Sequence, residues 1–155
     1  MKLAEALALR SDAQKQYLQL RARAQATARY QEGEVPAEDA AALLVEADRA
    51  LDELEDLIRR INRTNAVAEV APGSSLTDAL ARRDVLRLRH ALYTNVADAG
   101  AGAGVSVGRQ MRSELRVMSA VAVDELRATA DDIAKELRQL DLRIQEKNWE
   151  VELLD

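Results

Sequence analysis

The sequence holds few side chains whose type and spacing could do chemistry, and the most suggestive are two asparagines in the stretch INRTN. Asn62 and Asn65 lie three residues apart, so on a helix they are surface neighbours. Asparagine amides donate and accept hydrogen bonds, and they can therefore end a helix or bind a polar ligand. Asn65 also occupies a position where the preceding seven-residue pattern calls for an apolar side chain.

Four more polar or amphipathic side chains are expected at the same end of the molecule. If four helices run up and down in turn, the end of the second, the start of the third and the end of the fourth lie together. The candidate ligand-binding residues are therefore Asn62, Asn65, Arg83, Asp84, Asn148 and Trp149. Two interpretations stay open: a structural polar layer that fixes register or a subunit contact, and a small-molecule site.

Other catalytic and metal-binding patterns are missing from the sequence. His90 is the sole histidine and cysteine is absent, so a zinc site built from several Cys and His residues does not fit. Arg87 stands three residues before His90, where a di-iron bundle needs glutamate. There is no G-x-S-x-G turn, and the stretch GAGAGVSVG lacks the Lys-Ser/Thr of a phosphate-binding loop. We therefore expect no enzyme activity, no metal and no cofactor.

The composition is that of an all-α protein. Alanine and leucine, the best helix formers, supply 29 and 22 of the 155 residues, whereas phenylalanine is absent and aromatic residues make up 3%. The net charge is −5, and the arginines of RRDVLRLRH spread around a helix without interleaved aromatic side chains. This pattern argues against a nucleic-acid partner.

The order of helix-forming and helix-breaking residues predicts a single domain, 1–155, folded as a bundle of long antiparallel helices or coiled-coil-like hairpins. The predicted elements are helices at about 2–30, 38–65, 76–98 and 123–152, a flexible glycine-rich loop at 99–108, and a short extended segment around 113–121. Gly33 suits the left-handed end of the first helix, Asp39 suits the start of the second, and SLTD from Ser75 resembles a capping box.

The second helix has an unusually wide apolar face. Its main row is predicted to comprise Leu44, Ala47, Leu51, Leu54, Ile58, Ile61 and finally Asn65, with a parallel row of Leu43, Ala50 and Leu57 one residue earlier. A face this wide exceeds what one neighbouring helix covers. The last helix has the most regular heptads: Leu126, Ala130, Ile133, Leu137, Leu140 and Ile144.

The charges and the thin apolar faces suggest how the helices associate. Residues 2–30 carry a net charge of +4 and residues 31–58 a net charge of −9, so the first two helices are expected to face each other. Long helices with a core of alanine and leucine often complete their burial against another subunit. We therefore expect a homo-oligomer.

The sequence also favours a cytoplasmic protein with no membrane partner. It has no cysteine for disulfides, its first residues lack the apolar core of a signal peptide, and no stretch reaches the ~18–20 apolar residues of a spanning helix.

Several landmarks resemble a family of small bacterial helical proteins that carry the label septicolysin. They occur in order along nearly the whole chain: MKLAEAL, QEGEVPAED, LIRRINRTN, LTDALARRDVLRLRH and LRIQEKNWEVEL. The resemblance implies a fold of long antiparallel helices, with no catalytic residues to carry over. The label itself suggests a membrane-lytic activity, although no face rich in Trp or Lys supports insertion.

Three functions are thus open from the sequence. The first is a non-enzymatic bundle that self-associates as a structural or protein-interaction module. The second is a small-molecule-binding or catalytic protein that uses the polar cluster, and the third is a septicolysin-like membrane-active protein.

Overall fold

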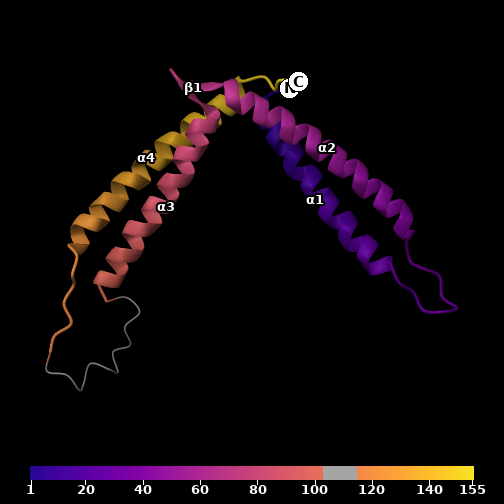
Figure 1. The fold of residues 1–155 in the computed structure, drawn as a ribbon, viewed down its shortest axis with the longest axis horizontal. Helices are drawn as coiled ribbons and strands as arrows, with labels where there is room; N and C mark the ends of the chain where they lie inside the picture. Colours follow the sequence, from indigo (N-terminus) through magenta and orange to yellow (C-terminus); the bar gives the residue numbers. More distant parts are fainter. Residues whose placement is uncertain (103–114) are drawn as a thin grey trace. The chain divides into compact units, whose positions relative to one another are not determined.

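A computed structural model describes residues 1–102 and 115–155 and confirms the all-α class (Figure 1). Its elements are α1 (Leu3–Thr27), α2 (Ala40–Val67), β1 (Glu69–Ala71), β2 (Ser74–Ser75), α3 (Leu76–Gly100) and α4 (Val123–Glu150). Each helix begins and ends within three residues of its predicted boundary.

The chain divides into two compact units, and each is described by itself. The first unit comprises Met1–Thr77 and Gln145–Asp155, and the second comprises Asp78–Ile144. Helix α4 contributes residues to both units.

In the first unit, α1 and α2 form an antiparallel pair held mainly by apolar side chains that are spaced three, four or seven residues apart on each helix. The buried residues are Leu3, Ala6, Ala13, Leu20 and Ala24 on α1, and Leu43, Ala47, Ala50, Leu57, Ile61 and Thr64 on α2. This spacing keeps a single stripe of each helix turned toward its neighbour. The many alanines in it let the two helix axes lie close together.

The predicted main row of α2 was partly wrong. The side chains of Leu44, Leu51 and Ile58 are 58%, 38% and 40% exposed, whereas the row one residue earlier, Leu43, Ala50 and Leu57, is buried. Successive helix residues point about 100° apart, so only one of two adjacent rows can face α1 squarely. The other row lies at the edge of the contact, on the open side of the hairpin.

The turn between α1 and α2 follows the predicted chemistry. Gly33 takes a positive φ of 88°, which a side chain would disfavour. The Asp39 carboxylate caps α2 by accepting hydrogen bonds from the backbone N–H of Ala41 (2.9 Å) and Ala42 (3.2 Å).

The end of α2 is tied to the C-terminal end of the chain through Thr64, which is fully buried. Its hydroxyl donates to the Arg60 carbonyl (2.8 Å) and accepts from the Leu154 backbone N–H (3.0 Å). Beside it, the backbone N–H of Leu3 donates to the Val151 carbonyl at 2.9 Å. Thr64 is therefore a buried polar residue at this end, one position before the asparagine that the sequence singled out.

A small hairpin links α2 to α3. Strands β1 and β2 are antiparallel, and Gly73 at their turn has a φ of 72°. The backbone N–H of Leu76 then donates to the Ala68 carbonyl at 2.7 Å. The sequence marked this stretch only as a helix break, because strands of three and two residues are too short to show a periodicity.

In the second unit, α3 and α4 lie antiparallel (Figure 1). Ion pairs join Arg87 to Asp141 (3.8 Å) and Asp98 to Arg127 (3.2 Å), so later residues of α3 face earlier residues of α4. The predicted heptad row of α4 is confirmed, since all of its six residues in this unit are buried or half-buried.

Two further predictions concern the segment between α3 and α4. Of the predicted loop 99–108, residues 99–100 end α3, 101–102 form a turn, and 103–108 lie outside the described residues. Of the predicted extended segment 113–121, the first two residues lie outside them, and 115–121 belong to no helix or strand.

We predict that Thr64→Val destabilises the protein by about 1–3 kcal/mol, because valine keeps the volume of the buried side chain but removes the acceptor of the part-buried Leu154 N–H. Urea unfolding measures the change. Thr64→Ser, which keeps the hydroxyl, is the control for the loss of the hydrogen bond. A valine variant as stable as the wild type would show that this bond contributes nothing.

Glu152 gives a pH prediction. Its carboxylate lies 2.7 Å from the Lys2 ammonium, and the hydrogen bond from Lys2 lowers the pKa of Glu152. A lowered pKa in the folded state means that the pair stabilises the protein above the ordinary glutamate pKa of about 4.3, and that this contribution is lost as the pH falls through the folded-state pKa. Thermal unfolding between pH 3 and pH 7 should show Glu152→Gln below the wild type at neutral pH, with the difference vanishing in acid. A difference that grows on acidification would contradict this assignment.

Candidate interaction site

A groove of about 410 Å³ runs along one open side of the α1–α2 hairpin. It is lined by Tyr17, Arg21, Ala24, Gln25 and Ala28 from α1 and the residue that follows it, and by Ala40, Leu44, Ala47, Asp48 and Leu51 from α2. The buried alanines Ala24 and Ala47 form its floor, and the exposed Leu44 and Leu51 stand at its edge. The groove is therefore shallow and mainly apolar.

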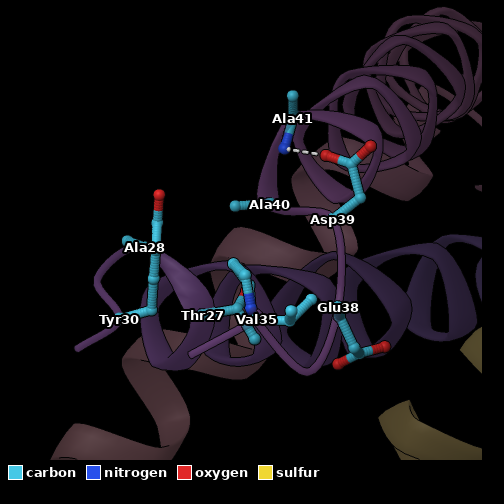
Figure 2. Close-up of a pocket in the computed structure, with 9 residues that line it drawn as sticks. Thr27, Ala28, Tyr30, Val35, Glu38, Asp39, Ala40 and Ala41 are labelled. Atoms are coloured by element: carbon cyan, nitrogen blue, oxygen red, sulfur yellow. Dashed lines mark hydrogen bonds between the residues drawn. The ribbon is translucent and has the colours of Figure 1, made fainter. Parts of the chain in front are cut away.

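A second hollow, of about 430 Å³, adjoins the groove at the α1–α2 turn (Figure 2). It is lined by Thr27, Ala28, Tyr30, Val35, Pro36, Glu38, Asp39, Ala40 and Ala41. The two hollows share Ala28 and Ala40, so one concave surface extends from the turn along the side of the hairpin.

The acidic residues of this second hollow serve the fold. Asp39 is occupied as the helix cap, as the dashed bond to Ala41 shows in Figure 2. The Arg23 Nε–H is shared between the two Glu38 carboxylate oxygens, each 3.1 Å away, and Arg23 Nη2 also donates to Glu38. These hydrogen bonds lower the pKa of Glu38. The hollow thus offers a ligand mainly the apolar surface of Tyr30, Val35 and Pro36.

The two edges of the groove carry opposite charges. Arg21 stands on the α1 edge, with its guanidinium carbon 5.9 Å from the centre of the Tyr17 ring. Asp48 stands on the α2 edge. Within residues 1–102 and 115–155, neither Arg21 nor Asp48 takes part in an ion pair, so both charges are available to a partner.

These features suit contact with a helix better than chemistry. The lining holds no histidine or serine, and the described residues contain no group of three or more His, Cys, Asp or Glu side chains that could hold a metal ion. An exposed apolar groove edged by charges is a common form of protein interaction surface.

The six residues predicted as a ligand site fall into the two units. Asn62, Asn65, Asn148 and Trp149 belong to the first unit, and Arg83 and Asp84 belong to the second. Asn148 is buried, Asn65 is half-buried, and Asn62 and Trp149 are exposed. Among the described residues, the one hydrogen-bonded side-chain pair within this set joins Arg83 to Asp84, at 3.3 Å. The ligand site stays a prediction.

The groove itself was not predicted from the sequence, although two features that indicate it were present. The apolar face of α2 was seen to be wider than one neighbour covers, and the first two helices were seen to carry opposite charges. The sequence did not show which apolar row of α2 faces α1. That row decides where the uncovered leucines lie.

The second unit also has exposed apolar side chains. On α3 they form a row of Val85, Leu88, Leu92 and Val96. A hollow of about 560 Å³ lies near the end of this row, between the last turn of α3 and residues 117–121. Across the described part of the chain, no helix has the length and apolar content needed to span a membrane.

Comparison with known proteins places the chain among proteins without a known function. The model of a family of unknown function, DUF6847, matches residues 10–153. A crystal structure of a functionally unknown conserved protein from Corynebacterium diphtheriae is 42% identical in sequence, with a TM-score of 0.92 over 99% of each chain. No curated protein matches the chain.

The resemblance to the septicolysin-labelled family was wrong. The family that matches nearly the whole chain is DUF6847, and neither it nor the similar crystal structure carries that label.

Proposed function

We propose that this chain, which belongs to the DUF6847 family of unknown function, is a self-associating structural or protein-interaction module. The observation that supports the proposal is the uncovered apolar side of the α1–α2 hairpin, where Leu44, Leu51 and Ile58 lie beside a groove floored by alanine. Water contact with such a continuous apolar surface is unfavourable, and association relieves it.

The size of this side suits a stable interface. A helix of 25 residues is about 37 Å long, and two packed helices are about 20 Å wide. The open side therefore offers roughly 700 Å² per copy, close to the ~800 Å² that each partner contributes to a standard interface. A second layer of two helices would convert the hairpin into a coiled-coil-like four-helix bundle.

The rest of the proposal concerns chemistry and location. We take the protein to act without catalysis, because the groove presents alanine, leucine and two opposite charges to a partner. A cytoplasmic location is part of the proposal and is supported by the cysteine-free composition. The polar cluster around Asn65 remains a second candidate site, which a thermal-shift screen of metabolites against the wild type and Asn65→Ala would test.

We predict that the purified protein is an oligomer and that Leu44→Glu shifts it toward the monomer. Leu44 is exposed in the single chain, so glutamate is tolerated there by the fold, but it would place a charge in the apolar contact. Sedimentation velocity at micromolar concentrations measures the change, and we expect the dissociation constant to rise at least about tenfold.

The matched control is Leu88→Glu on α3, which makes the same change at an exposed leucine of the second unit. It should leave the oligomer intact. A wild-type monomer at 100 μM or more would contradict self-association, and dissociation caused by Leu88→Glu alone would move the contact to α3.

The single domain predicted from the sequence is also part of the proposal. Helix α4 supplies Val123–Ile144 to one unit and Gln145–Glu150 to the other, and a continuous helix couples the unfolding of the segments it joins. We therefore expect a single calorimetric transition. Its van't Hoff enthalpy should equal the calorimetric enthalpy per mole of oligomer. Two separated transitions would show that the units unfold as independent domains.

A further inference from the structure

We propose that the α1–α2 groove is closed by the same groove of a second copy, in a two-fold arrangement that lays α1 of each copy on α2 of the other. The inference rests on the proposed self-association and adds the partner, the helix pairing and the residues that select it. The main evidence for it is that Arg21 and Asp48 lie on opposite edges of one apolar groove.

The two edges lie at corresponding levels along the hairpin. A single core cluster contains Leu20 and Ala24 from α1 together with Leu43, Ala47 and Ala50 from α2. Arg21 directly follows Leu20, and Asp48 directly follows Ala47. The cation and the anion thus flank the same layer of the core.

A two-fold axis that runs along the groove, parallel to the helices, brings these opposite charges together. Such an axis keeps the level of every residue along the helices but exchanges the two edges, so Arg21 of each copy lies over Asp48 of the other. Two equivalent ion pairs then close the interface. Each α1 also lies antiparallel to the α2 beneath it, which is the arrangement of an antiparallel four-helix bundle.

The alternative two-fold axis, perpendicular to the helices, stacks like helix on like helix. It places α1, whose residues carry a net charge of +2, on its own copy, and α2, whose residues carry a net charge of −2, on its own copy. Like charges across an interface are destabilising, so the charge distribution selects the first axis.

A second copy fits the groove for further reasons. The open side offers about the area of a standard interface, as estimated above. The two-fold operation also places the basic edge of each copy against the acidic edge of the other. An unrelated partner helix would have to present both a basic and an acidic edge at this spacing.

The test uses two charge reversals, Arg21→Glu and Asp48→Arg, with association measured by sedimentation velocity at low salt, where screening is weak. Each variant alone brings two like-charge contacts together, and we expect its dissociation constant to rise about tenfold. An equimolar mixture of the two variants restores both ion pairs in a heterodimer. Its dissociation constant should therefore return to within about threefold of the wild type.

Arg49→Glu is the matched control, because Arg49 is exposed on α2 outside the groove and the substitution makes the same charge change. It should associate like the wild type. Circular dichroism and thermal unfolding of every variant separate a loss of association from a loss of fold.

The outcomes separate this inference from the proposed function. If the wild type self-associates but the single reversals have no effect, or their mixture is not rescued, the pairing proposed here is wrong and self-association stands. If the wild type is a monomer at all accessible concentrations, both proposals fail.

Discussion

The close approach of α1 and α2 is the constraint on which the rest of the first unit depends. Alanines such as Ala13, Ala24, Ala47 and Ala50 in the contact rows bring the two helices together, but each buries little apolar area. The pair therefore has a thin core, and leucines at the edge of the contact stay uncovered. Association with another copy, as proposed above, would add apolar burial to this single layer of two helices.

The charged residues have a different role from the apolar contact residues. The ion pairs of the described chain lie at the surface, where pairs such as Lys2–Glu152 contribute little to stability. Opposite charges are better suited to choosing orientation, since a mismatched register places like charges together. The excess of basic residues on α1 and of acidic residues on α2 thus fits a role in aligning helices, both within the hairpin and between copies. In the proposed dimer, the apolar surface would supply the affinity and the charges would set the orientation of the helices.

Composition and breaker residues were sufficient to predict the helices, because Gly33 and Asp39 act through local backbone chemistry. The row of α2 that faces α1 was harder to predict. Leu43 and Leu44 are chemically identical neighbours, and only the tertiary contact with α1 decides that one is buried and the other exposed. The same limit applies to Thr64, whose partner Leu154 is 90 residues away. A groove formed by two helices is a property of their packing, which a single helical pattern does not contain.

Spin-label distance measurement tests self-association through the groove most directly. The chain has no cysteine, so a label on Gln25→Cys at the groove edge is unique within each copy. If two grooves close on each other, the singly labelled protein gives an inter-copy distance on the order of 20 Å, about two helix diameters. A label at Arg49, outside the groove, should give a longer one. Absence of any dipolar signal at Gln25, or a shorter distance at Arg49, would contradict the account.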